Sequence, residues 1–186
     1  MSNNYFKKYL IGCALLLMSL FYISAIAQET KPEAVVTDFL NVYNFSANKV
    51  AQLAEAIPAD KYDWRPAEGI RSIREVILHS TAGNYFFGSI LGATPPEGVD
   101  PQSLEKSEMR KEKVTAAFKK SLTIIQEALK KLTKEQLNEQ IEFFGNKISK
   151  RQAMFGLGDH VAEHLGQLIA YARMNGVVPP WSKKTN

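Results

Sequence analysis

Cysteine and histidine are both scarce in this sequence, and their scarcity limits the kinds of catalytic and metal-binding site that it can form. The chain has 186 residues, with one cysteine at Cys13 and three histidines. Cys13 lies in an apolar N-terminal run that resembles a cleaved leader. Without it, no disulfide, cysteine nucleophile or cysteine metal site can form in the remaining chain. Any metal ligands therefore have to come from histidine or carboxylate side chains.

The N-terminus has the composition of a secretory signal peptide. Lys7 and Lys8 precede an apolar run over 10–23, and Ala25 and Ala27 place small residues before an expected cleavage at Gln28. The run is shorter than the roughly 20 residues that a membrane span needs, so no stable membrane insertion is expected after cleavage. We predict a signal peptide over 1–27, a single domain over 28–186, and export to the periplasm or the medium. Lipid attachment at Cys13 is the alternative.

The charge pattern argues against a nucleic-acid partner. After residue 27 the chain carries 21 basic and 19 acidic residues, and the lysines and arginines are interspersed with glutamates. No basic stripe interleaved with aromatic side chains is present. We expect a small-molecule partner rather than nucleic acid.

Apolar residues at helical spacing predict four long helices and an all-α fold, a four-helix bundle with a short extra helical turn and loops. Ser72 and Ser149 each begin a capping-box pattern, and Gly176 follows the last helix as a cap. The segment 133–148 holds a short helical turn and an extended piece over 141–145. The predicted helices cover 32–57, 72–91, 104–132 and 149–176.

The three histidines are distributed so that they can meet. His160 and His164 are four residues apart, which puts both imidazoles on one face of a helix. His79 lies on a different predicted helix and converges with them if the two helices are neighbours. Three neutral imidazoles leave a position open on a zinc-sized ion, as in catalytic sites. In the alternative interpretation, His160 and His164 are an accidental pair on a partly exposed helix face, and His79 is a hydrogen-bonded core residue.

The stretch from His160 to His164 also reads as H-x-x-E-H, an inverted zinc-peptidase motif with Glu163 as general base. That class needs a further acidic ligand well downstream, and only 22 residues follow His164. Glu163 is more simply explained as a solvated helix residue. Asp159 and Glu163 each neighbour a ligand in sequence and point about 100° away from it.

Three segments together resemble the DinB-like (YfiT-like) family of metalloenzymes. HVAEHLGQLIAYARMNGVVPP over 160–180 resembles its closing helix, YDWRPAEGIRSIREVILHS over 62–80 its second-helix entry, and VYNFSANKVAQLAEAIP over 42–58 its first helix. The resemblance implies a four-helix bundle, often a homodimer, with zinc or nickel held by His79, His160 and His164. Some relatives use a small thiol such as bacillithiol or mycothiol, and export of this chain weakens that role here.

Several other polar or aromatic residues are candidates for the surroundings of such an ion. Gln167, Asn44 and Asn48 could orient a ligand or a bound water; a solvent-facing or helix-packing role is the alternative for each. Tyr62 and Trp64 are expected to form a packed lid at one bundle end, with a substrate clamp as the alternative. Arg65 and Arg173 could attract an anion, with ordinary ion pairs as the alternative.

The sequence therefore leaves two functions open. The first is a metal-dependent enzyme of the transferase or hydrolase type that acts on a small molecule. The second is a non-catalytic metal-binding module whose ion ties two helices together.

Overall fold

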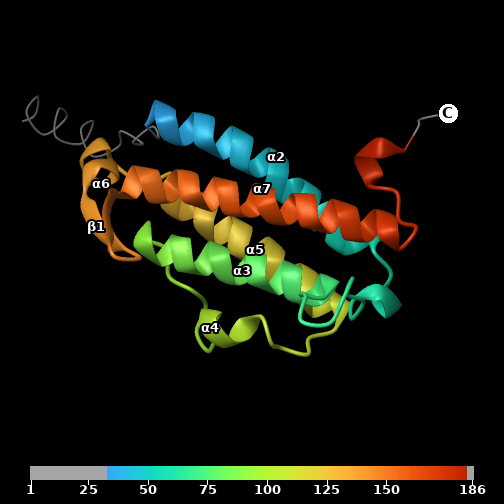
Figure 1. Ribbon diagram of the computed structural model, residues 1–186. Helices are drawn as coiled ribbons and strands as arrows, with labels where there is room; N and C mark the ends of the chain where they lie inside the picture. The colour runs from blue at the N-terminus through green and yellow to red at the C-terminus, as the bar shows by residue number, and fades with distance from the viewer. Residues whose placement is uncertain (1–32, 184–186) are drawn as a thin grey trace, which may run out of the picture. The chain divides into compact units, whose positions relative to one another are not determined.

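Four long helices form a bundle in the computed structural model, which describes residues 33–183 (Figure 1). The predicted signal peptide over 1–27 and Cys13 lie outside these residues. The predicted all-α bundle is confirmed. Between residues 33 and 183, no helix is both long enough and apolar enough to cross a bilayer. The long helices are α2 (Ala34–Ala56), α3 (Ile73–Ile90), α5 (Lys111–Leu129) and α7 (Lys150–Met174).

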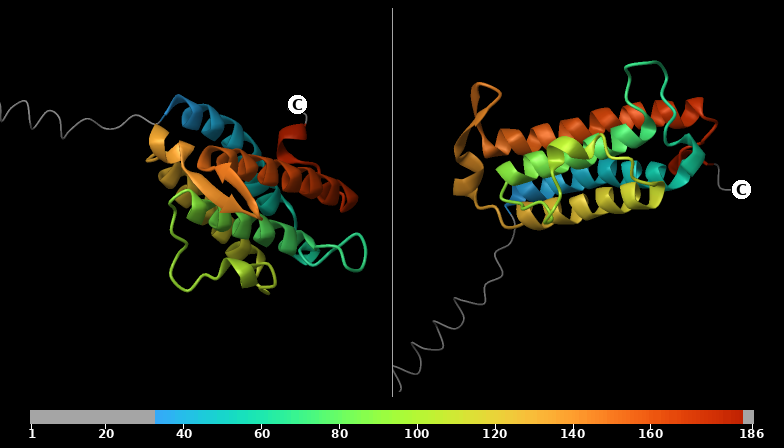
Figure 2. Two further views of the ribbon diagram at one scale, coloured as in Figure 1. Left: turned by 60° about the vertical axis from the view of Figure 1, so that its left-hand side comes forward. Right: turned by 90° about the horizontal axis from the view of Figure 1, so that it is seen from below.

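Shorter elements connect the long helices. A two-stranded antiparallel hairpin precedes α7, where the sequence predicted only one extended piece. The left view of Figure 2 shows this hairpin beside the start of α7. The short elements are η1 (Ala59–Lys61), α4 (Pro101–Leu104), α6 (Lys134–Asn138), β1 (Gln140–Phe143), β2 (Asn146–Ser149) and η2 (Pro180–Ser182).

Both predicted capping boxes are present. The Ser72 hydroxyl accepts from the Glu75 N–H at 3.2 Å, and the Glu75 carboxylate accepts from the Ser72 N–H at 2.8 Å. Ser149 and Gln152 make the same reciprocal pair at the start of α7. These bonds satisfy backbone donors that the first helical turn leaves free. They fix where the two histidine-bearing helices begin.

The predicted helix over 104–132 is wrong in its first part. The chain forms the single turn α4, leaves helical geometry over 105–110, and begins α5 only at Lys111. Met109 is the only apolar residue between Leu104 and Val114, so this stretch has little to bury against the bundle. Glu105 instead turns toward α3.

The order of the helices explains the long connection between α3 and α5. Asn84 donates to Ser121, and Gly88 lies against Ile125, so α3 and α5 run in the same direction. A chain that leaves the end of α3 must therefore return along the bundle before α5 can start. The segment 91–110, with α4 in it, makes this return over the outer face of α3 (Figures 1 and 2).

A buried hydrogen-bond chain ties three of the helices together. The Tyr43 hydroxyl donates to Asn84 Oδ1 at 2.8 Å, Asn84 Nδ2 donates to Ser121 Oγ at 2.8 Å, and Ser121 Oγ donates to the Phe118 carbonyl at 2.7 Å. Tyr43, Asn84 and Ser121 are buried among apolar side chains of the core. Their polar atoms are paired, as buried polar groups must be.

Candidate metal centre

The structure brings the three histidines together between α3 and α7. One ring nitrogen of each of His79, His160 and His164 lies within 4.8 Å of the others. The Nε2 atoms of His79 and His160 are 3.2 Å apart. Ligand atoms at about 2.05 Å from a tetrahedral zinc ion are about 3.4 Å apart, so this pair already has the spacing of two ligands. We call these three side chains the histidine cluster.

Local sequence explains how the cluster fits. His79 on α3 meets His160 and His164, which lie one turn apart on α7, because α3 and α7 are packed neighbours. Gly83 lies one turn after His79 and carries no side chain. A Cβ at Gly83 would lie 2.2 Å from Cε1 of His160, so glycine leaves the space that this imidazole occupies.

Glu105 orients His79. Its Oε2 lies 2.8 Å from Nδ1 of His79, and Arg71 binds the same carboxylate with Nε at 2.9 Å and Nη2 at 3.3 Å. Burial raises the pKa of Glu105, but the hydrogen bonds from Arg71 and His79 outweigh it and hold this pKa below its usual value. An ionised carboxylate only accepts, so His79 donates through Nδ1–H, and in the neutral imidazole this leaves the lone pair on Nε2.

Gln167 orients His164 in the same way. Its Oε1 lies 3.0 Å from Nδ1 of His164, and its Nε2 donates to the Tyr171 hydroxyl at 2.9 Å. The amide oxygen accepts from Nδ1–H, which leaves Nε2 of His164 unprotonated. Such partners raise the basicity of a metal-binding imidazole and fix its tautomer.

His160 is the most strongly perturbed member of the cluster. Burial, with smaller contributions from His164 and His79, lowers its pKa to about 4, so the ring is neutral at pH 7. Burial also lowers the pKa of His164, against the opposing effect of its bond with Gln167. Nδ1 of His160 is buried and has no hydrogen-bond partner within the part of the chain that the structure describes. Neutral imidazole rings gathered this closely can supply lone pairs to a cation.

Among the other polar candidates from the sequence, Gln167 contacts the histidine cluster, and the rest have other surroundings. Asn44 accepts from Gln126 at 2.7 Å in a helix contact, and Asn48 is exposed. Asp159 and Glu163 are exposed on α7. Neither belongs to the group of potential ligands within residues 33–183. The structure therefore gives no support to a peptidase motif built on Glu163.

The aromatic candidates have packing roles, and of the two basic candidates one forms an ion pair and the other is exposed. Tyr62 is buried, and Trp64 packs edge-on against Tyr171 with ring centroids 5.4 Å apart. Arg65 pairs with Glu75 at 3.2 Å, and Arg173 is exposed in the last turn of α7. Tyr62 and Trp64 form the expected packed end of the bundle.

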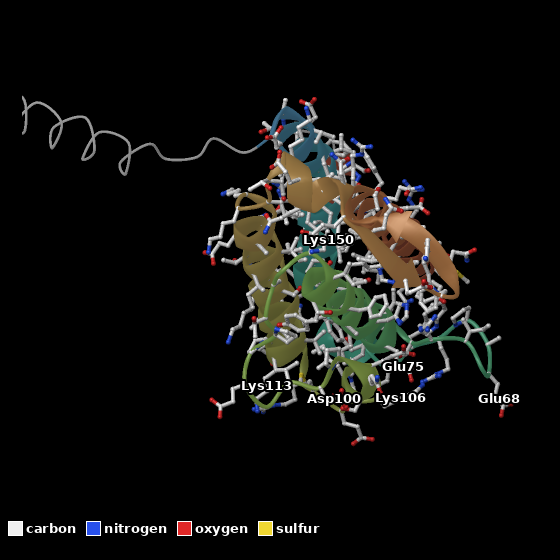
Figure 3. All side chains as sticks on the ribbon, turned by 90° about the vertical axis from the view of Figure 1, so that its left-hand side faces the viewer. Glu68, Glu75, Asp100, Lys106, Lys113 and Lys150 are labelled. Atoms are coloured by element: carbon white, nitrogen blue, oxygen red, sulfur yellow. The ribbon has the colours of Figure 1, made fainter. Side chains whose placement is uncertain are left out.

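Two cavities adjoin the cluster and share Glu105. One, of about 450 Å³, is polar and includes Arg65, Arg71, Lys106 and Gln167 in its wall. Figure 3 shows Glu75 and Lys106 beside each other; both line this cavity, and their charged groups are 3.1 Å apart. The other, of about 560 Å³, is largely apolar and includes His79 and His160 in its wall. Small molecules therefore have room to approach the cluster.

A four-helix bundle with parallel α3 and α5 and a histidine cluster between α3 and α7 defines a particular class of helical protein. The family model of the DinB family matches residues 28–185. The chain belongs to the DinB family, which confirms the resemblance seen in the sequence.

Individual relatives agree with this assignment. The uncharacterized protein YjoA of Bacillus subtilis is 28% identical over 145 residues, which cover 76% of this chain and 89% of YjoA. The crystal structure of YjoA, a DinB-like protein, matches with a TM-score of 0.62 and 26% identity over 76% of this chain and 93% of that one.

Two more distant structures share the fold. A DinB-like protein from Bacillus cereus has a TM-score of 0.67 at 18% identity, over 76% of this chain and 93% of that one. YfiT from Bacillus subtilis, described as a probable metal-dependent hydrolase with an unusual four-helix bundle topology, has a TM-score of 0.61 at 16% identity. That match covers 81% of this chain and 93% of YfiT.

Proposed function

We propose that the protein binds one divalent metal ion, zinc or nickel, through His79, His160 and His164. We further propose that it acts as a metal-dependent enzyme of the hydrolase or transferase type on a small molecule. The observation that carries the proposal is the convergence of three imidazoles, two of them held by Glu105 and Gln167, beside open cavities. The description of YfiT as a metal-dependent hydrolase is consistent with this assignment.

The chain's own groups prepare the site. Glu105 and Gln167 fix the tautomers of His79 and His164, and Gly83 makes room for His160. Only three potential ligands come together within residues 33–183, so an ion held by them would keep a coordination position open to a further ligand. When bound there, a divalent ion supplies a Lewis acid with an open position. Glu105 is already engaged by Arg71 and His79, and its role is to position a ligand.

The alternative is an ion that only ties α3 to α7. The core argues against it, because apolar side chains from all four long helices are buried without help from the cluster. Closed four-ligand sites are typical of structural zinc, whereas catalytic sites keep a position open. Removal of the ion should therefore leave the bundle folded.

Metal content tests the proposal. Residues 28–186 should retain about one zinc or nickel per chain by plasma mass spectrometry, and His160→Ala should lose it. Asp159→Asn changes the exposed neighbour of His160 and is the matched control, which should keep the metal. Wild-type protein without metal, even after incubation with zinc or nickel and desalting, would overturn the proposal. Loss of the helical circular dichroism signal on chelation would favour the structural alternative.

A further inference from the structure

The largely apolar cavity beside the histidine cluster has a wall of phenylalanines that no part of the proposed function explains. Phe86 and Phe87 reach it from α3, and Phe144 reaches it from the hairpin turn. Ring centroids of Phe86 and Phe144 are 5.9 Å apart, and those of Phe87 and His160 are 6.0 Å apart. We call this space the phenylalanine cavity. It joins two elements from distant parts of the sequence next to two of the proposed ligands.

Two of the phenylalanine side chains that line the cavity are exposed to solvent. Phe86 is 42% exposed and Phe144 is 80% exposed. Phe144 has a φ of +48°, a left-handed conformation that is costly for a bulky residue and that places its ring at the tip of the hairpin. Neighbouring exposed aromatic rings around a concavity are typical of a surface that a ligand covers.

The charges around the phenylalanine cavity define what it can accept. Among the described residues that line it, none is lysine or arginine, and the only carboxylate is Glu105, which Arg71 and His79 already bind. The cationic side chains Arg65, Arg71 and Lys106 line the other cavity. An ionic group placed among the phenylalanines would lose hydration without a partner, so the cavity selects against it.

We propose that the phenylalanine cavity takes the uncharged, aromatic or aliphatic body of a small molecule whose donor group completes the coordination of the metal. Its volume of about 560 Å³ lies in the range of about 300–1,000 Å³ that is usual for small-molecule sites. His79 and His160 line the same cavity as the phenylalanines, so a single small molecule can contact the phenylalanine rings and the proposed metal site together. This inference rests on the proposed metal site and names the class of substrate for it.

A pair of probes that share one metal-binding group tests the proposal. Benzohydroxamate and acetohydroxamate carry the same hydroxamate donor, but the first adds a phenyl ring in place of a methyl group. With zinc-loaded protein, isothermal titration calorimetry should give a dissociation constant for benzohydroxamate that is lower by about tenfold, because the ring is removed from water. Phe86→Ala and Phe144→Ala should reduce this ratio to about twofold, with acetohydroxamate binding unchanged.

Phe45→Ala is the matched control. Phe45 is exposed on α2, where it contacts Lys49 and does not line the cavity, so its loss should leave the ratio unchanged.

Each other outcome has a distinct meaning. Equal affinities for the two probes, or a ratio that survives both substitutions, would overturn the phenylalanine cavity as a ligand site and leave the metal site intact. Failure of both probes to bind zinc-loaded protein would overturn the open coordination position, and this inference with it. A change in sedimentation coefficient for Phe86→Ala with an unchanged ratio would show that a second copy of the chain covers the cavity.

Discussion

Gly83 on α3 faces the imidazole of His160 on α7 so closely that no side chain fits between them. A Cβ built at Gly83 would lie 2.2 Å from Cε1 and 2.7 Å from Nδ1 of His160. Glycine is unfavourable inside a helix by about 1 kcal/mol relative to alanine. The bundle accepts this cost at the point where the histidine cluster needs room.

Gly83→Ala should therefore separate folding from metal binding. The new methyl group pushes the His160 ring out of the cluster, while the helix itself favours alanine. We expect a folded bundle whose zinc affinity falls by at least about tenfold, as for a misplaced ligand. Competition with a chromogenic chelator measures the affinity, and circular dichroism measures the fold.

Gly166→Ala is the control for this substitution. Gly166 also lies in a long helix, α7, but nothing lies within 4 Å of a Cβ built there. The variant should keep its zinc affinity and gain thermal stability. Equal zinc affinity in Gly83→Ala and the wild type would contradict the assigned position of His160.

Glu105→Gln should weaken zinc binding without removing a ligand. The amide can still accept from Nδ1–H of His79, but it loses the negative charge that makes the imidazole more basic. We expect affinity to fall by about 10- to 100-fold. Glu108→Gln changes an exposed acid on the same connection and should have no effect, as the chelator competition would show. Equal losses in the two variants would show that only the net charge matters.

The stability of the protein should depend on pH through Glu75. Burial alone raises the pKa of Glu75, but the hydrogen bond from the Ser72 N–H and the charges of Lys106 and Arg65 lower it below its usual 4.5. Because the folded-state pKa is the lower one, the ionised carboxylate stabilises the fold above about pH 4.5. This stabilisation disappears as the pH falls through the folded-state pKa.

Glu75→Gln keeps the capping geometry and removes the charge. It should lower the free energy of unfolding by up to about 1 kcal/mol at pH 7 and by less at pH 2.5, where more of the carboxylate is protonated. Urea unfolding at both pH values measures the difference. Glu68, which Figure 3 labels, is exposed on a loop and supplies the control, because Glu68→Gln should change neither value. A loss for Glu75→Gln that is the same at both pH values would assign its effect to geometry.

In the buried hydrogen-bond series Tyr43–Asn84–Ser121, removal of the central side chain should lower the free energy of unfolding more than removal of the terminal Tyr43 hydroxyl. Asn84→Ala leaves the Tyr43 hydroxyl and Ser121 without their partner and should cost about 2–4 kcal/mol. Tyr43→Phe leaves only Asn84 Oδ1 unpaired and should cost about 1–2 kcal/mol. Urea unfolding at pH 7 gives both values, and the reverse order would show that water enters the site.

Features encoded by short-range patterns could be predicted from the sequence. The starts of α3 and α7 follow from the capping boxes at Ser72 and Ser149, whose partners are three residues away. The histidine cluster needed only one further condition, that α3 and α7 be neighbours, which the structure satisfies.

One partner of the histidines was within reach of the sequence and the other was not. Gln167, three residues after His164, was among the candidates to orient a ligand. The partner of His79 could not be predicted, because it depends on a contact between distant segments. Glu105 was expected inside a continuous helix over 104–132, whereas the break after α4 directs it to His79, 26 residues earlier. Gly83 gave a signal that the sequence analysis did not use. A glycine inside a helix, one turn after a candidate ligand, is a place where another side chain approaches closely.

The return of the chain over 91–110 brings a further segment to the wall of the phenylalanine cavity. The three histidines lie on α3 and α7, whereas Pro101, Gln102 and Glu105, on the returning segment, form part of the wall that a bound molecule would meet. This segment carries few buried apolar groups, so its length and side chains can vary at little cost to the bundle. Substitutions at Pro101 or Gln102 would therefore change the surface that a bound molecule meets, whereas Glu105 has to stay because it also holds His79.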